Sequence, residues 1–389
     1  MRIYLDHNAT TPVAPEVASA VAAALVDEFG NPSSVHHFGQ RAKAALDVAR
    51  QAVADLIGAQ PAEIVFTGGG TEADNLALRG SVDALAAAGR RHVVVSAIEH
   101  EAVLATLKAL GRRGIESTRV EVGVDGIVSP EAVAAAIRPD TALVSIMHAN
   151  NEVGTLQPVA GIAALAHARD VAVHTDAVQT AGRIPVDVEA LGVDLLTLSA
   201  HKFSGPKGVG ALYVRRGTRL AATTTGGRQE RNRRAGTENV PGIVGLGVAA
   251  ALARRRMADE GPRLACLRDR LEQGILATIP GTAINGAVDR RIPNTTNLSF
   301  EGVEAESLLI ALDLEGIAVS TGSACSSGTL EPSHVLRAMG LGTHRTQSSL
   351  RFSLGATTDT THIDRTLDVL AGLVARLRRL AGSGARPAR

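Results

Sequence analysis

Lys202 is the residue whose surroundings in the sequence point most directly to chemistry. It follows the apolar run 195–198 through the segment Ser199-Ala200-His201, and a Gly-rich turn at 203–208 comes next. A lysine amine at the end of a buried strand can condense with a carbonyl carbon and form an imine. Lys207, inside the turn, is the competing imine former, although its position is more typical of a structural role.

Four other short apolar runs are also followed by polar residues or glycines. The residues of interest at the ends of these runs are, in chain order, Gly70, Thr71, His100, Asn151, Asp176 and Gln179. A Gly-rich turn that opens a helix binds anions through free backbone N–H groups, which makes Gly70 and Thr71 candidates for phosphate binding. Each position alone also fits a structural interpretation, such as a tight turn, a helix cap or a buried histidine.

Taken together, the five strand ends supply the groups that hold a phosphorylated pyridine aldehyde. The carboxylate of Asp176 would keep the pyridine nitrogen protonated, so that the ring draws electrons from a substrate joined to it. The amine of Lys202 would form the imine, and the glycine turn would receive the phosphate. Functional groups collect at the carboxyl ends of parallel strands, so the sequence predicts a pyridoxal 5'-phosphate (PLP) site there.

The two cysteines of the chain have different surroundings. Cys325 lies in residues 320–329, where small polar residues and glycines are typical of an exposed loop. Packing does not explain a thiol in such a loop, which favours a reactive role. Cys266 lies among leucines in a helical pattern and is predicted to be buried. Two cysteines are too few for a disulfide framework or a closed zinc site.

Arginines form the third group of candidates. Arg351 lies in the strand-like run 348–353, where it would form either an edge-strand salt bridge or a bidentate clamp for a substrate carboxylate. Four arginines between 228 and 234 precede Thr237 and are typical of a solvated or interface loop. The chain lacks the broad basic face and interleaved aromatic residues of nucleic-acid-binding proteins.

The elements that must position these residues alternate between strand and helix patterns. Strands are predicted at 64–66, 93–95, 143–146, 171–174 and 195–198, and helices at 16–29, 41–57, 72–88, 101–110, 130–137 and 162–168. Because the strands are apolar throughout, we expect an α/β fold with a mostly parallel sheet between helices. A long helical pattern at 249–276 leads to a smaller α+β part. In that part we expect strands at 297–300 and 350–353 and helices at 305–312 and 363–380.

The length of 389 residues exceeds one compact core and predicts two domains. The large domain is expected at 13–255, the small domain at 1–12 and 256–380, and a disordered tail at 381–389. With 40 Lys and Arg against 39 Asp and Glu, the composition does not favour binding to nucleic acid or membranes. The sequence shows no secretory signal and no apolar run of membrane-spanning length, so we expect a cytoplasmic protein.

With these residues described, the chain resembles the cysteine desulfurases, within the class V aminotransferase-like group of fold-type I PLP enzymes. The resemblance runs from Tyr4 to about Thr357. The segments that match are 4–12, 68–75, 148–158, 174–179, 199–210 and 320–336. It implies that the enzyme removes sulfur from L-cysteine, which gives alanine and a persulfide on Cys325.

The resemblance further implies a set of cofactor-binding residues. They are Gly70, Thr71, His100, Asn151, Asp176, Gln179, Ser199, His201, Lys202 and Thr237. Within this set, Lys202 carries the cofactor, His100 stacks on its ring and shuttles protons, and Asp176 pairs with the pyridine nitrogen. Thr237 reaches a phosphate across the interface of a homodimer. Asn151 and Arg351 bind the carboxylate of the substrate.

The resemblance leaves the sulfur acceptor open between an iron–sulfur scaffold, a tRNA-thiolation protein and a DNA-modification partner. The length of the Cys325 segment resembles the iron–sulfur subgroup, in which Cys325 would also serve as a transient iron–sulfur ligand. An aminotransferase, a selenocysteine lyase and a non-catalytic scaffold are the alternatives. The chain departs from the usual family pattern at His7-Asn8, Gly70 and Arg228, and His7 could perturb the approach of the substrate.

Overall fold

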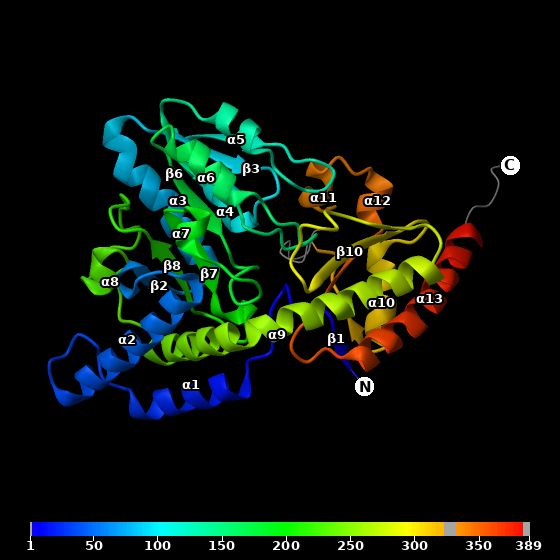
Figure 1. Ribbon diagram of the computed structural model, residues 1–389, viewed down its shortest axis with the longest axis horizontal. Helices are drawn as coiled ribbons and strands as arrows, with labels where there is room; N and C mark the ends of the chain where they lie inside the picture. Colours follow the sequence, from blue (N-terminus) through cyan, green and yellow to red (C-terminus); the bar gives the residue numbers. More distant parts are fainter. Residues whose placement is uncertain (1, 323–331, 384–389) are drawn as a thin grey trace.

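The computed structural model describes residues 2–322 and 332–383, and its largest element is a seven-stranded sheet (Figure 1). The strands are β2 (Ile64–Thr67), β3 (His92–Ser96), β4 (Glu116–Val120), β5 (Thr141–Ser145), β6 (Ala172–Asp176), β7 (Leu195–Ser199) and β8 (Gly210–Val214). They lie in the order β2-β8-β7-β6-β5-β3-β4. Strand β8 runs antiparallel to both neighbours, whereas the other pairs are parallel. This arrangement confirms the predicted α/β class with a mostly parallel sheet.

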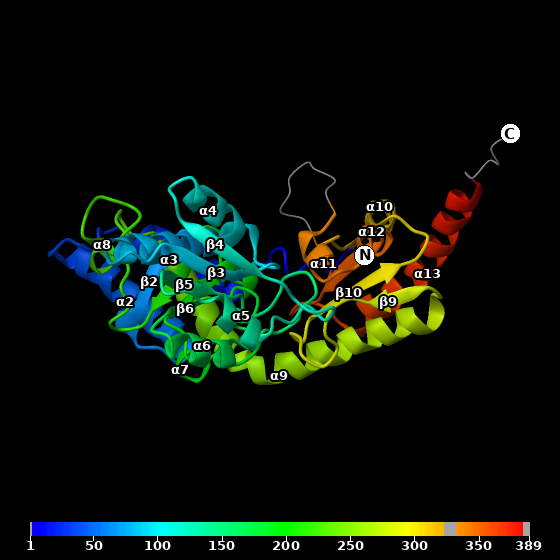
Figure 2. The same cartoon turned by 90° about the horizontal axis from the view of Figure 1, so that it is seen from above.

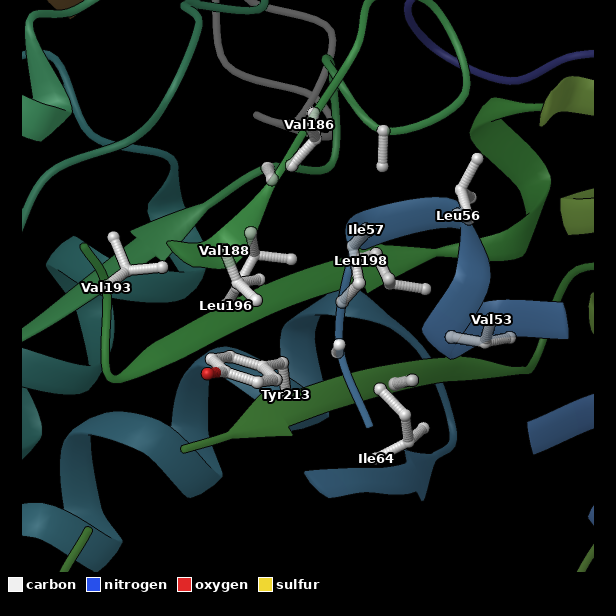
Figure 3. Packing of buried hydrophobic residues seen from close by; sticks show 14 of the residues in the cluster. Val53, Leu56, Ile57, Ile64, Val186, Val188, Val193, Leu196, Leu198 and Tyr213 are labelled. Atoms are coloured by element: carbon white, nitrogen blue, oxygen red, sulfur yellow. The ribbon is translucent and has the colours of Figure 1, made fainter. Parts of the chain in front are cut away.

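Helices cover both faces of this sheet because successive strand residues point to opposite sides. In β2, Ile64 and Phe66 belong to the hydrophobic core that contains residues of α2, whereas Val65 belongs to the core that contains residues of α3. Figure 3 shows Val53 of α2 near Ile64 and Leu198, on the first of these faces. Strands buried on both faces explain why the strand patterns in the sequence are continuously apolar.

The helices around the large sheet begin and end at residues with clear local signals. They are α1 (Pro15–Asp27), α2 (His37–Ile57), α3 (Gly70–Leu85), α4 (Glu101–Gly111), α5 (Pro130–Ala136), α6 (Val159–His167), α7 (Val188–Leu191) and α8 (Gln229–Asn232). Short 3₁₀ turns are η1 (Pro61–Glu63), η2 (Ala86–Ala88) and η3 (Ala200–Lys202). Helix α2 ends at Gly58, whose φ of 68° is a left-handed conformation that glycine adopts without strain.

A second part of the molecule is built on a three-stranded antiparallel sheet, in the order β12-β10-β9. Its elements are β9 (Thr282–Ile284), β10 (Thr295–Phe300), β12 (Ser349–Ser353), α10 (Ala305–Leu314), α11 (His334–Ala338), α12 (Thr343–Gln347) and α13 (Thr360–Ser383). The N-terminal strand β1 (Ile3–Tyr4) pairs with β11 (Ile317–Ala318), so the start of the chain joins this part. Ile3 and Leu5 accordingly belong to its hydrophobic core.

Helix α9 (Val240–Thr278) connects the two parts and packs against α1 and α2 at one end and α13 at the other (Figures 1 and 2). It starts nine residues before the predicted helix because the side chain of Asn239 caps its first turn. The predicted domain boundaries remain a prediction, since this one helix continues through residue 255. No helix within the described ranges combines the length and the apolar character needed to cross a bilayer.

Three details differ from the sequence-based expectations. Strands β4 and β8 of the large sheet and the short strands β1, β9 and β11 were not expected, and α13 continues to Ser383, past the predicted start of the tail at 381. The remaining tail lies outside the described residues. Cys266 is exposed, so its predicted burial is wrong. Leu264, Leu267 and Leu271 lie on one buried face of α9, and Cys266 points about 100° to 160° away from them around the helix axis.

Candidate active site

A cavity of about 360 Å³ lies where β3, β5, β6 and β7 end. Its lining comprises Asn8, Ala9, Gly70, Thr71, Asp74, His100, Met147, Ala149, Asn151, Asp176, Val178, Gln179, Ser199, His201, Lys202, Gly322 and Arg351. The structure therefore brings together all the candidate residues except Thr237 and Cys325. Cys325 lies outside the described residues, and Thr237 is exposed and belongs to a separate small cavity beside Gly68.

Lys202 reaches the cavity from η3, directly after β7. Its Nζ donates hydrogen bonds to the backbone carbonyls of Asn8 (2.6 Å) and Ala9 (2.9 Å), so the N-terminal segment crosses next to the amine. Lys207, the competing imine former, is exposed and does not line the cavity. The geometry thus favours Lys202 over Lys207 as the reactive amine.

Asp176 ends β6 and is 6% exposed. Its Oδ1 accepts a hydrogen bond from the backbone N–H of Val178 (2.9 Å). Burial raises the pKa of Asp176, while the nearby His100 and Lys202 act in the opposite direction. A buried carboxyl of this kind would bind a cation, because a positive charge beside it offsets the loss of hydration.

The glycine turn and β7 form an anion cradle at one end of the cavity. Gly69 precedes α3 with a φ of 147°, a conformation that glycine adopts far more readily than other residues. The N-terminus of α3 then presents Gly70 and Thr71 to the cavity, where its free N–H groups favour negative charge. Burial, with smaller effects from Lys202 and Lys207, lowers the pKa of the nearby His201 to about 4, so its ring is neutral.

Arg351 lines the cavity from β12 and forms a salt bridge there, whereas its role as a clamp for a substrate carboxylate stays a prediction. Its Nη2 pairs with Asp6 Oδ1 (2.6 Å), which is a salt bridge, and its Nη1 donates to the carbonyl of Asn151 (3.0 Å). The backbone of Arg351 also exchanges hydrogen bonds with Ser320, just before Gly322 at the cavity wall. A buried guanidinium that lines a cavity can also receive a carboxylate ligand.

Two further residues of the site were not recognised in the sequence. Arg183 donates to the side chains of Asn8 and Gln179 and to the carbonyls of His7 and Lys202. It thus ties the N-terminal segment to both sides of the cavity. Its position four residues after Gln179 was the available signal. Asp74, on α3, is the other residue and lines the cavity directly.

His7 does not line the cavity that holds Lys202 Nζ. Its Nδ1 bonds to the carbonyl of Ser353 (3.1 Å), and the ring is 2% exposed beside Gly355. Burial lowers the pKa of His7 to about 4. The side chain lines a second cavity, of about 290 Å³, which shares Lys202 with the first. The expected effect of His7 on substrate approach is therefore not supported by a direct contact.

Residues 3–366 match the family described as aminotransferase class-V. The cysteine desulfurase IscS of Dictyoglomus turgidum is 49% identical over 379 residues, which cover 97% of this chain and 96% of that protein. A cysteine desulfurase of Cereibacter sphaeroides is 50% identical over 387 residues, covering 99% and 98% of the two chains.

Solved structures give the same result. A NifS-like protein superposes with a TM-score of 0.91 at 36% identity and covers 97% of this chain and 100% of that one. The structure described as SspA in complex with cysteine has a TM-score of 0.81 at 36% identity, covering 91% and 99%.

Proposed function

Because the chain belongs to the cysteine desulfurases, enzymes of the class-V aminotransferase family, we propose that it binds PLP at Lys202 and desulfurates L-cysteine, with Cys325 as sulfur acceptor. The observation that carries this proposal is the single cavity that joins the Lys202 amine, the Asp176 carboxyl and the cradle at α3. The relatives' names supply the reaction, and the cavity supplies groups suited to it.

The residues of the cavity fit PLP on chemical grounds. The buried Asp176 needs a cationic partner, which a protonated pyridine nitrogen provides. The start of α3, with Gly70 and Thr71, suits a phosphate dianion. When bound, PLP supplies a carbonyl for the imine and an electron-withdrawing ring that weakens bonds at the α-carbon of an amino acid.

The substrate would be oriented mainly by Arg351. Its guanidinium would receive the cysteine carboxylate together with Asn151, and its existing bond to Asp6 (2.6 Å) would hold it in place. Lys202 Nζ, once freed by the amine of the substrate, would carry protons to or from the substrate's carbon atoms. His100, at the cavity wall, would cover the reacting groups.

Cys325 is supported by chain connectivity. Gly322 lines the cavity and Cys325 follows it by three residues, a length of chain that spans at most about 11 Å when extended. The connectivity is therefore compatible with attack by this thiol on a substrate in the cavity. The thiolate of Cys325 would attack the substrate sulfur. A sulfur–sulfur bond forms as the carbon–sulfur bond breaks, and the electron pair stays on the carbon that becomes the methyl group of alanine.

We also propose that the active form is a homodimer in which Thr237 contacts the phosphate of the other subunit. Thr237 is exposed and away from its own cavity. The end of α1, the start of α2 and the segment between them expose large apolar side chains that a second copy would cover, namely Leu25, Val26, Phe29, Val35 and Phe38.

Mixed dimers test this arrangement. Co-expressed Lys202→Ala and Thr237→Ala chains should regain activity, because one of the two sites in each mixed dimer then has both residues intact. No regain would place Thr237 in the site of its own chain.

The persulfide of Cys325 would be passed to an acceptor protein in the cytoplasm, with an iron–sulfur scaffold as the first candidate and tRNA thiolation as the second. On a scaffold, Cys325 would be a transient ligand of the iron–sulfur cluster. Among the residues that the structure describes, no group of three or more His, Cys, Asp or Glu side chains could hold a metal ion.

The proposed reaction is tested by incubating the PLP-loaded protein with L-cysteine and a thiol reductant. We expect alanine and sulfide in equal amounts. Transfer of the amino group to a keto acid, with no sulfide released, would instead show an aminotransferase. The absence of a visible absorbance band from bound PLP would exclude both activities.

A further inference from the structure

Asp74 is a buried acid in the cavity to which the proposed reaction assigns no role. It belongs to α3, is 1% exposed and lines the same cavity as Asp176 and Lys202. A carboxyl group at such a position is costly if it is ionised without strong partners. Its hydrogen bonds and its charged neighbours therefore decide what it can do.

The hydrogen bonds of Asp74 come from neutral groups. Its Oδ1 is buried and has no hydrogen-bond partner among the described residues, although His174 Nε2 lies 3.6 Å from it. The side chain of Thr197 bonds to the carboxyl. Thr197 Oγ1 in turn lies 3.0 Å from His174 Nε2, and His174 Nδ1 lies 2.8 Å from Ser145 Oγ. Burial lowers the pKa of His174 to about 3, so this chain contains no positive charge.

The chain of hydrogen bonds runs directly beside Asp176. Thr197 of β7 is the register partner of Asp176 of β6, and His174 lies two residues before Asp176 on the same strand. Residues two apart on a strand share a face, so His174 and Asp176 point to the same side of the sheet. Asp74 therefore anchors a neutral network that packs against the carboxyl under the proposed pyridine nitrogen.

The charged neighbours distinguish the two aspartates. Burial raises the pKa of Asp74 well above its usual range, and the neighbouring carboxyls of Asp176 and Glu99 raise it further when they are ionised. Asp176 instead has His100 and Lys202 nearby, which favour its ionised form, and a backbone N–H donor from Val178. Glu99, the third acid, is also buried, and burial raises its pKa to about 8.

We propose that Asp74 is a positioning residue that remains a neutral acid and so leaves Asp176 as the charged carboxylate that would pair with the pyridine nitrogen. An ionised Asp74 would repel the charge of Asp176, whereas the neutral acid keeps the Thr197–His174 network in place without adding charge. This inference rests on the proposed pairing of Asp176 with the pyridine nitrogen.

Infrared difference spectra test the protonation state directly. The spectrum of the PLP-loaded protein minus that of Asp74→Asn should contain the C=O stretch of a protonated carboxylic acid at neutral pH. Glu99 is present in both proteins, so its band cancels. A difference that contains carboxylate bands instead would overturn the proposal.

Equilibrium dialysis tests the consequence for the cofactor. The dissociation constant of PLP for Asp74→Asn should stay within about threefold of that of the unchanged protein, because a neutral group replaces a neutral group. A rise of more than about tenfold in this dissociation constant, which equals the free energy of a shift by one pKa unit, would show that Asp74 contributes charge and would contradict the proposal. Asp74→Ala, which removes the anchor, should bind PLP more weakly than Asp74→Asn.

Two more variants keep the outcomes separate. Thr197→Val removes the bond to Asp74 and should shift the protonated C=O band to higher frequency, which tests the network even if Asp74→Asn folds poorly. An unshifted band would contradict the assignment. Asp176→Asn should lose PLP affinity. If it does not, the proposed pairing of Asp176 fails, while the band of Asp74 still reports its own protonation.

Discussion

Beneath the second sheet, Glu272 is matched on both carboxylate oxygens. In contrast, Asp74 in the cavity and Glu99, which directly precedes the cavity residue His100, each keep an oxygen without a hydrogen-bond partner among the described residues. Arg291 donates to both oxygens of Glu272, and Thr296 donates to one of them (2.6 Å).

The pKa values of the acidic groups in the two regions accordingly shift in opposite directions. Burial alone would raise the pKa of Glu272, but the bonds from Arg291 and Thr296 lower it overall. Burial raises the pKa of the cavity acids. A buried acid that its own chain satisfies is structural, whereas a cluster of buried acids with raised pKa values at one cavity indicates a functional site, in which we assign the charged role to Asp176 and the neutral role to Asp74.

The largest effect is expected at Lys202. Lys202→Ala removes the amine that holds the cofactor and moves protons, so turnover should fall on the order of 10³-fold or more. Single-turnover assays with added PLP measure this loss. Lys207→Ala is the matched control, since Lys207 is exposed and outside the cavity, and it should keep activity. The opposite result for the two lysines would contradict the assignment.

On the structural side of the comparison, Glu272→Ala should destabilise the fold. It leaves the buried Arg291 with only the more distant carboxylate of Asp269 (3.7 Å), which should cost about 3–5 kcal/mol of the free energy of unfolding. Chemical denaturation measures the change, and PLP affinity of the folded fraction should stay the same. Glu16→Ala breaks an ion pair with Arg256 that is half exposed and should change the free energy of unfolding far less than Glu272→Ala does.

Arg351 combines features of both regions, because it forms a salt bridge with Asp6 and also lines the cavity. Arg351→Ala should raise KM for cysteine by an amount equivalent to about 2–5 kcal/mol, while PLP remains bound. Arg351→Lys keeps the charge but loses the bidentate geometry and should recover part of the effect. Steady-state kinetics with unchanged KM in Arg351→Ala would exclude the role in substrate binding.

Glu99 should make stability depend on pH. Its pKa is about 8 in the folded chain because of burial, above the value of about 4.5 expected when unfolded. The contribution of Glu99 to the free energy of unfolding is therefore fully present below about pH 4.5 and is lost as the pH rises toward and through about 8. The difference in the free energy of unfolding between Glu99→Gln and the unchanged protein should therefore increase, in favour of the variant, by about 2 kcal/mol when the pH is raised from about 6 to about 8.

Denaturant titrations of the two proteins at both pH values measure this gain. Because all other groups are shared, the difference reports Glu99. A stability difference that does not change with pH would contradict the raised pKa.

Much of the large sheet could be predicted because strands buried on both faces leave continuous apolar runs. Strand β4 was missed since four of its five residues, from Glu116 to Arg119, are polar and the strand lies at the edge of the sheet. The prediction that Cys266 is buried was wrong, although the next residue, Leu267, is buried. Such an error is inherent in helical patterns, where one residue changes the direction of a side chain by about 100°.

The candidate site was predictable where its residues follow strands. Asp74 was missed because it lies inside a helix, one turn after the glycine turn, where an acid is ordinarily exposed. Its burial results from the packing of α3 on the sheet, which no local pattern reveals. The roles of Thr237 and Cys325 depend on a second chain and on residues outside the described ranges, and they stay predictions.

The most direct test of the whole account is the location of the transferred sulfur. After one turnover with L-cysteine, without reductant, peptide mass spectrometry should find one added sulfur atom on the peptide that contains Cys325. The peptide with the exposed Cys266 serves as an internal control and should be unmodified. Cys325→Ser should still bind PLP and cysteine but release no alanine. Persulfide on Cys266, or normal alanine release by Cys325→Ser, would contradict the proposed mechanism.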